Sequence, residues 1–189
     1  LVGVTGIVRH LGSSLPAVEA AFIRYFIGLI IILPFMTEVL RSPPSRRQLA
    51  NYALRGLAHG GGVILWFFAM TRIPIAEVTA IGYTAPIFVA VGAAIFLGER
   101  MQIRRIGAIV VAFAGTMVIL RPGFQELSSG QIAQLCAAPL FACSFLMAKR
   151  MTDRSSSAVI VGMLSFFCTL ALLPGAIVQW KQPTGNEIA

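Results

Sequence analysis

The stretch that decides the fold reads VTAIGYTAPIFVAVGAAIFLG at residues 78–98, and it carries no charged side chain between Glu77 and Glu99. A helix of this length is about 30 Å long, which matches the hydrocarbon core of a bilayer. Residues 127–148 and 155–180 are also uncharged. The sequence therefore predicts an all-α integral membrane protein, a multi-span helical bundle.

Composition supports this class and argues against others. Hydrophobic residues make up 57% of the 189 residues and charged residues only 12%, whereas soluble domains carry about 25% charged residues. The net charge of +8 raises the question of a nucleic-acid partner. The basic residues form no continuous stripe, so we expect no nucleic acid and instead expect the lipid bilayer as a partner.

Turn residues divide the chain into seven predicted helical segments, the first of which is a stub that ends near Leu11. The other six are predicted at residues 16–37, 51–71, 75–98, 103–120, 130–148 and 157–180. The loops between them are too short to contain a soluble catalytic domain.

Basic residues alternate between the two sides of this bundle. Nine of the fifteen Lys and Arg side chains lie in or beside the loops that follow the second, fourth and sixth segments. They are Arg41, Arg46, Arg47, Arg100, Arg104, Arg105, Lys149, Arg150 and Arg154. The positive-inside rule predicts that these three loops face the cytoplasm. Trp180 would then anchor the last segment at the outer interface.

A weak internal repeat appears at an offset of 140 residues, which places Phe26 on Phe166 and Leu33-Pro34 on Leu173-Pro174. It also places Arg9-His10 on Lys149-Arg150. The offset covers five helices, so the two copies would cross the membrane in opposite senses, as in many secondary transporters. We assign residues 1–124 to one five-helix repeat and residues 125–189 to the start of an inverted, incomplete second repeat. We expect about three further helices after residue 189.

Signatures of catalysis are missing from the sequence. It contains no P-loop, no H-E-x-x-H, no C-x-x-C and no G-x-S-x-G motif. The three cysteines lie within apolar spans, where we interpret them as small hydrophobic residues. We therefore predict no catalytic residues, no metal site and no cofactor, and a protein that is not an enzyme.

Polar residues inside the spans are the candidate site, because charge in hydrocarbon is costly and usually functional. Arg24 lies about 12 Å along the second segment; it either faces the bundle interior or reaches the interface, where Glu19 is an alternative partner. Glu77 begins the fourth segment, where a carboxylate is either a helix cap or a substrate anchor. His59 is a further candidate.

Glycines and aromatic residues surround these polar groups. Gly56-x-x-x-Gly60 predicts close helix packing, and the run Gly60–Gly62 suggests that the helix unwinds there to line a cavity. Trp66, Tyr83 and Thr84 are candidate pocket walls, although aromatic rings that face lipid are the alternative.

Two residues are candidates for gating or structure. Pro86 predicts a kink in mid-span, because proline lacks an N–H group. Glu99 lies next to Arg100 at the cytoplasmic end, where an exposed ion pair is the simplest interpretation, and we favour a structural latch over a substrate role.

The region from Trp66 to Gly123 resembles the EamA-type repeat of the drug/metabolite transporter superfamily. The resemblance rests on WFFAM at 66–70, IAEVTA at 75–80, TAPIF at 84–88, FLGER at 96–100, Gly107, Gly115 and RPG at 121–123, together with FIRY at 22–25, which contains Arg24. It implies a ten-helix carrier in the inner membrane, with both termini in the cytoplasm and a small metabolite as substrate.

These observations together predict a secondary transporter of amino-acid-, amine- or nucleoside-like metabolites that works by alternating access. Arg24 and Glu77 would be polar anchors, and Glu77 or His59 would be the site of any proton coupling. A non-transporting membrane scaffold or inactive fragment is one alternative, and a membrane enzyme acting on lipid substrates is another. A homodimer is an arrangement that the sequence leaves open.

Overall fold

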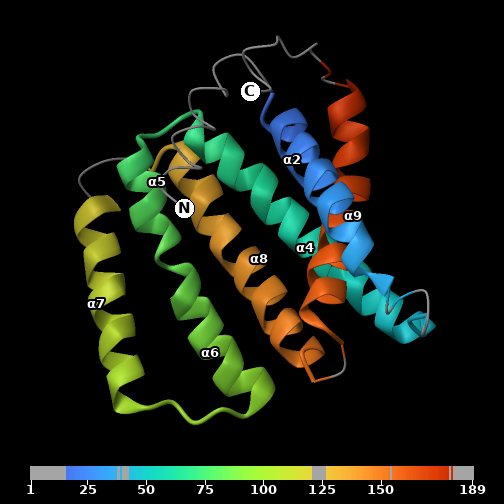
Figure 1. Ribbon diagram of the computed structural model, residues 1–189. Coiled ribbons are helices and arrows are strands. Elements are labelled where there is room, and N and C mark those ends of the chain that lie inside the picture. Colours follow the sequence, from blue (N-terminus) through green and yellow to red (C-terminus); the bar gives the residue numbers. More distant parts are fainter. Residues whose placement is uncertain are drawn as a thin grey trace. The chain divides into compact units, whose positions relative to one another are not determined.

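A computed structural model of the chain describes residues 16–37, 39, 43–120, 127–153, 155–178 and 180. The regular structure in these residues is helical, which confirms the predicted all-α fold (Figure 1). The helices are α2 (Ala17–Ile32), the 3-10 turn η1 (Leu33–Phe35), α4 (Arg46–Met70), α5 (Ile75–Gly82), α6 (Ala85–Leu97), α7 (Ile103–Leu120), α8 (Ser129–Met151) and α9 (Ser157–Val178). The predicted stub that ends near Leu11 lies outside the described residues.

Within the part of the chain that the structure describes, five helical segments are long and apolar enough to cross a membrane. They are Val18–Phe35, Arg46–Met70, Ile75–Leu97, Ser129–Met151 and Ser157–Val178. A sixth helix, α7, has a shorter apolar part, Ile106–Val118, whose large side chains such as Val111 and Val118 are more than 70% exposed. Apolar side chains in such positions suit contact with lipid, so the chain is a multi-pass membrane protein.

The third predicted segment begins earlier than the sequence pattern suggested, at Arg46 rather than Asn51. Ser45 and Gln48 form a capping box, in which the Ser45 N–H donates to Gln48 Oε1 at 2.8 Å and the Gln48 N–H donates to Ser45 Oγ at 3.3 Å. These bonds satisfy backbone groups at the helix start. Hydrophobicity alone gave the apolar part of α4 and missed its polar first turn.

The fourth predicted segment is two helices rather than one kinked helix. α5 ends at Gly82, α6 begins at Ala85, and the side chain of Thr84 donates to the carbonyl of Ile81 at 2.6 Å between them. Pro86 lies in the first turn of α6, where its missing N–H group is tolerated. The kink predicted at Pro86 is therefore a break of the helix just before it.

The expectation that the helix unwinds at Gly60–Gly62 is wrong, because α4 continues through all three glycines. Packing explains the difference. A Cβ on Gly60 would lie 3.7 Å from Ala171 of α9, one on Gly61 would lie 3.6 Å from Leu140 of α8, and one on Gly62 would lie 3.1 Å from Phe141. Close approach of neighbouring helices thus holds this glycine run helical.

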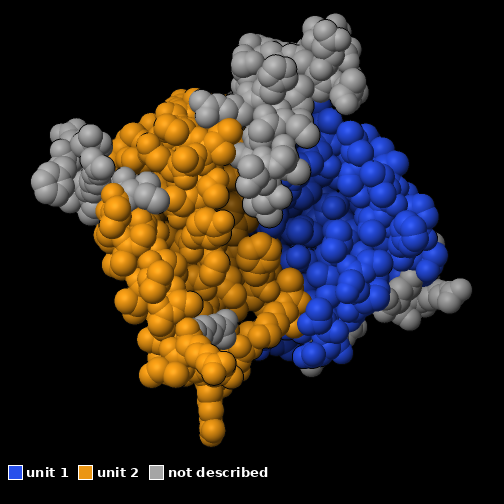
Figure 2. All heavy atoms as spheres, turned by 60° about the vertical axis from the view of Figure 1, so that its left-hand side comes forward, with its two compact units in different colours: residues 1–60, 150–189 blue, residues 61–149 orange. Residues whose placement is uncertain are grey.

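The chain forms two compact units, which Figure 2 colours blue and orange. Unit 1 consists of residues 1–60 and 150–189, and unit 2 consists of residues 61–149. α4 contributes its first part to unit 1 and its last part to unit 2. These units are not the repeats assigned from the sequence, 1–124 and 125–189, and that assignment stays a prediction.

In unit 1, α2 and α9 pack side by side (Figure 1). They are antiparallel, because Val18 lies against Gly175 while Gly28 lies near Ser165 further along α2. Their first residues, Ala17 and Ser157, differ by 140 positions, so this is the opposite orientation that the proposed offset requires of equivalent helices. A cluster of Met36, Tyr52, Val159 and Met163 closes one end of unit 1.

In unit 2, the α5–α6 segment lies between α7 and α8. α7 contacts both α5 and α6, and Gly92 of α6 lies against Leu146 of α8. The last part of α4 packs on α8 through Gly61 and Gly62, and the turn after α4 lies against the start of α8, where a Cβ on Gly130 would lie 2.9 Å from Ile73. Gly98 ends α6 with φ 67°, a conformation that glycine adopts readily.

Loops that the positive-inside rule placed on one side lie at the same end of each unit. In unit 1, the hydroxyls of Tyr52 and Ser155 are 2.7 Å apart, which joins the start of α4 to the start of α9. In unit 2, Glu99 pairs with Lys149 at the ends of α6 and α8. Which side is cytoplasmic stays a prediction. Arg41 and Arg154, as well as Arg9-His10 in the repeat, lie outside the described residues.

Candidate functional site

The predicted site residues are divided between the two units. Arg24 and His59 belong to unit 1, and the structure brings both to the ring of Tyr25. The other candidates belong to unit 2 and are Trp66, Glu77, Tyr83, Pro86 and Glu99. Each group is described within its own unit.

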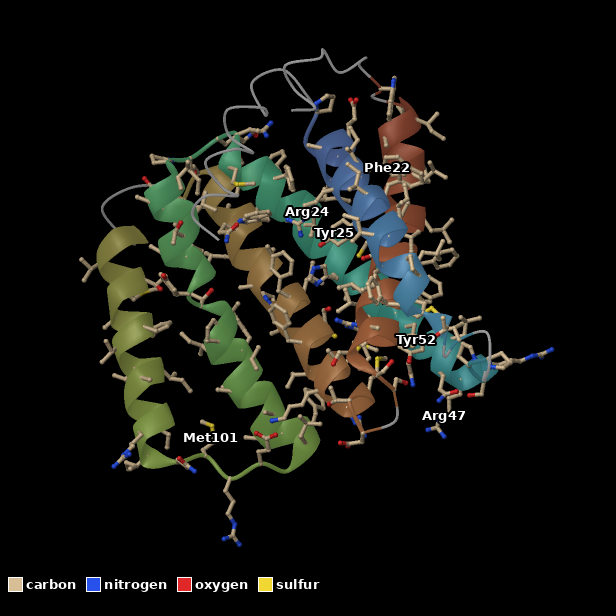
Figure 3. All side chains as sticks on the ribbon, in the orientation of Figure 1. Phe22, Arg24, Tyr25, Arg47, Tyr52 and Met101 are labelled. Carbon is tan, nitrogen blue, oxygen red and sulfur yellow. The ribbon has the colours of Figure 1, made fainter. Side chains whose placement is uncertain are left out.

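Tyr25 is the centre of the polar cluster in unit 1. Arg24 Nη2 donates to the Tyr25 hydroxyl at 3.0 Å, and its Cζ lies 4.9 Å from the ring centroid (Figure 3). The His59 ring meets the same ring edge to face, with 6.0 Å between the centroids. Tyr25 and His59 are buried, whereas Arg24 is exposed. The aromatic ring therefore links a buried histidine to an accessible arginine.

Arg55 is a member of this cluster that the sequence analysis did not select. It is 5% exposed, and its Nη1 donates to the carbonyl of Ile160 on α9 at 2.7 Å. Arg55 and His59 are four residues apart, which places them on one face of α4. The rule that identified Arg24, a charge inside a membrane span, also applied to Arg55.

Small residues let α4 and α9 approach closely enough for these contacts. Gly56 lies directly against Phe167, and Gly60 lies against Ala171 at the same spacing of four residues. The thiol of Cys168 lies 3.4 Å from the Gly56 carbonyl. This confirms the close packing that Gly56-x-x-x-Gly60 predicted.

Arg24 has the environment of a binding group more than that of a fixed ion-pair partner. Among the described residues, no carboxylate lies within ion-pair distance of its guanidinium group. Its bond to the neutral Tyr25 hydroxyl leaves several of its five donors available. Whether it faces a cavity or reaches the interface stays a prediction.

In unit 2, two glutamines of α8 reach α5. Gln131 Nε2 donates to Glu77 Oε2 at 2.9 Å, and Gln134 Nε2 donates to the Val78 carbonyl at 3.1 Å. Gln131 also accepts the Ser128 N–H at 2.9 Å in a capping box. Glu77 is therefore held by a side chain as well as placed at a helix start. The sequence analysis missed both glutamines, although the S-x-x-Q pattern at 128–131 was readable.

The two aromatic side chains predicted as pocket walls differ in environment. Trp66 is partly buried and packs edge to face on Phe67, with 5.3 Å between ring centroids. Tyr83 is 63% exposed at the break between α5 and α6. Their role as walls of a substrate pocket stays a prediction.

Glu99 forms an ion pair that joins two helices. Its partner is Lys149 at the end of α8, which the sequence analysis did not suggest. The Glu99 side chain is 30% exposed and the Lys149 side chain is 57% exposed. A pair across α6 and α8 has the form of the latch that we favoured, and its effect on gating stays a prediction.

Within the described residues, no group of three or more His, Cys, Asp or Glu side chains is placed to hold a metal ion.

Comparison with known proteins identifies relatives for most of the chain. The family model for the EamA-like transporter family matches residues 2–121. An S-adenosylmethionine uptake transporter of Rickettsia felis is 27% identical over 181 residues, which cover 96% of this chain and 62% of the relative. A riboflavin transporter of Vibrio cholerae is 27% identical over 177 residues, covering 93% of this chain and 59% of the relative.

A third relative, the pseudopaline exporter CntI of Pseudomonas aeruginosa, is 25% identical over 172 residues, with 90% of this chain and 60% of the relative covered. The chain thus spans less than two thirds of the length of these relatives. No solved structure matches it significantly. The family match confirms the resemblance found in the sequence, and the relatives that accompany it are named as transporters.

Proposed function

Since this chain belongs to the EamA-like transporter family, we propose that the protein is a secondary transporter which moves small organic metabolites across the inner membrane. Its mechanism would be alternating access between inverted repeats, which is common among transporters built in this way. The antiparallel packing of α2 on α9 supports this mechanism, because these helices begin at equivalent positions of the proposed repeats.

The observation that carries the proposal is the cluster around Tyr25 in unit 1. Two arginines and a histidine lie in helices that cross the membrane, where unneeded charge is costly. Arg55 donates a hydrogen bond to the Ile160 carbonyl, which joins α4 to α9. Arg24 is exposed and bonds only a neutral hydroxyl among its described neighbours, so it is the group of this cluster that suits an anionic part of a substrate.

The names of the relatives support a class of substrate rather than one compound. They name S-adenosylmethionine, riboflavin and pseudopaline, and they include both an uptake transporter and an exporter. These are small polar metabolites. We propose an amino-acid-, amine- or nucleoside-like substrate that carries a carboxylate or another anionic group for Arg24.

Transport by the full-length protein tests this proposal. Purified protein in liposomes would be supplied with isotope-labelled amino acids, polyamines and nucleosides, and the compounds that cross would be measured by mass spectrometry. We expect at least one class to cross faster than in protein-free liposomes. No transport of any compound would contradict the proposal and would favour a non-transporting scaffold, whereas chemical conversion of added lipid would indicate an enzyme.

A further inference from the structure

We propose that Gln134 of α8 is a substrate-binding residue whose side-chain oxygen accepts a hydrogen bond from an N–H group of the transported metabolite. This proposal rests on the transport function proposed above, and it adds a chemical requirement on the substrate.

Gln134 lies against the last part of α5, within unit 2. Its Nε2 donates to the Val78 carbonyl at 3.1 Å, and only 3% of the residue is exposed. A Cβ on Gly82 would lie 3.3 Å from the same nitrogen. The absence of a side chain at Gly82 thus gives the amide its place beside the point where α5 ends.

The oxygen of this amide is the unusual atom. Gln134 Oε1 is buried and has no hydrogen-bond partner among the described residues. The orientation of the amide follows from chemistry, because only the NH₂ group can donate to the Val78 carbonyl. Both helices belong to membrane spans, where a buried acceptor without a donor costs free energy. A donor from a bound ligand would remove that cost.

The helix break beside this amide adds further acceptors. Pro86 has no N–H group, so it cannot donate to the carbonyl of Gly82 as a residue in a continuous helix would. The N–H of Ile87 donates to the Thr84 carbonyl at 2.9 Å rather than four residues back. The backbone between α5 and α6 therefore offers carbonyl oxygens where a regular helix would offer none.

A carboxylate lies one helical turn away along the same two helices. Glu77 precedes Val78 on α5, and Gln131, which donates to it at 2.9 Å, lies three residues before Gln134 on α8. Acceptors and negative charge together favour a ligand donor such as an ammonium or amide N–H and disfavour a carboxylate. The chemical class that fits Gln134 is therefore a primary or secondary amine, ammonium or amide group.

Two cations of equal charge test this requirement directly. n-Butylammonium has N–H donors, whereas n-butyltrimethylammonium has none. We expect n-butylammonium, but not n-butyltrimethylammonium, to raise the melting temperature of the purified full-length protein. Gln134→Leu should weaken the apparent affinity for n-butylammonium by about tenfold or more. Gln102→Leu makes the same change at an exposed loop residue and should bind as the unmodified protein does.

A purely structural amide gives a different pattern. Leu replaces the buried amide with apolar atoms and removes the unpaired acceptor, so Gln134→Leu should leave the melting temperature without ligand unchanged or higher if Gln134 serves a ligand. Gln134→Glu keeps an acceptor oxygen but loses the donor to the Val78 carbonyl, so it should bind n-butylammonium better than Gln134→Leu does. The proposal is overturned if both cations stabilise the protein equally, if Gln134→Leu keeps the binding, or if Gln134→Glu loses it as fully as Gln134→Leu.

Transport measurements separate this proposal from the function on which it rests. If the unmodified protein moves a compound with an N–H donor, Gln134→Leu should lower its transport about tenfold or more. Normal transport by Gln134→Leu would overturn the role of Gln134 alone. If the unmodified protein moves nothing, the proposed function fails, and the two butyl cations still decide whether Gln134 binds an N–H group.

Discussion

Unit 1 and unit 2 hold their polar groups in different ways. In unit 1, cationic side chains lie around an aromatic ring between helices that glycines bring close, as Gly56 and Phe167 show. In unit 2, a helix is broken, and neutral amides from α8 bridge to one of its halves. The close packing of α4 on α9 makes unit 1 suited to hold a charged side chain in a fixed position. The break between α5 and α6 makes unit 2 suited to present backbone carbonyl groups. We therefore expect mutations in the two units to have different effects.

The sidedness of the two units gives the largest expected effect, because labelling is all or none. In a background with Cys136→Ala and Cys143→Ala, we expect Pro43→Cys in unit 1 and Gln102→Cys in unit 2 to react with an impermeant maleimide only from the cytoplasmic side. Leu127→Cys should react only from outside and is the control. Labelling of Pro43→Cys and Gln102→Cys from opposite sides of the membrane would show that the two loops do not face the same side.

Arg24 tests whether the cluster of unit 1 serves the substrate. We expect Arg24→Leu in the full-length protein to lower transport at least about thirtyfold, because a charge pair with the substrate is lost. Arg24→Lys should be impaired less, since it keeps the charge and loses the planar donor group. Membrane insertion and expression should be unchanged.

Arg47→Leu is the matched control, because Arg47 lies exposed in the first turn of α4 (Figure 3). It should transport normally. Normal transport by Arg24→Leu as well would show that Arg24 only reaches the membrane interface.

Glycine substitutions compare the packing of the two units. We expect Gly56→Ala to lower the free energy of unfolding by about 1–3 kcal/mol, because the new methyl group meets both the side chain and the backbone of Phe167. Gly92→Ala in unit 2 meets the flexible end of Leu146 and should cost less. Gly107→Ala has open space and should cost nothing. Unfolding in a graded detergent mixture measures the order, and equal losses for Gly56→Ala and Gly92→Ala would contradict the comparison.

The ion pair of unit 2 should contribute the smallest effect. Glu99 and Lys149 are partly exposed, so we expect a coupling free energy of about 0–1 kcal/mol from a double-mutant cycle of Glu99→Gln and Lys149→Met. A larger coupling in transport rate than in stability would sharpen its role as a latch. No coupling in either measurement would leave it a simple surface pair.

Much of the fold could be predicted from the sequence because hydrocarbon imposes simple requirements. Apolar runs bounded by turn residues predicted six segments within the described residues, and α7 begins and ends as predicted, at Ile103 and Leu120. The misplaced start of α4 has a local cause, because the Ser45–Gln48 capping box extends the helix into polar sequence. The break before Pro86 could not be predicted from the proline alone, because α8 continues as one helix through Pro139.

The candidate site was only partly predictable. A charge inside an apolar span is visible in the sequence, which is why Arg24, His59 and Glu77 were selected. Their partners come from helices distant in sequence, as Gln131 does for Glu77 and Ile160 does for Arg55. No local pattern states which face of α8 or α9 turns toward them.

The sequence by itself determined that this chain is a helical membrane protein of the EamA type, because burying backbone in lipid requires long apolar helices and the family motifs lie within them. Only the tertiary structure decided that Gly60–Gly62 stays helical, that Tyr25 joins Arg24 to His59, and that the Gln134 amide reaches Val78 with its oxygen unpaired among the described residues. The physical reason is that these outcomes depend on how closely neighbouring helices approach. That distance is set by side chains on several helices at once.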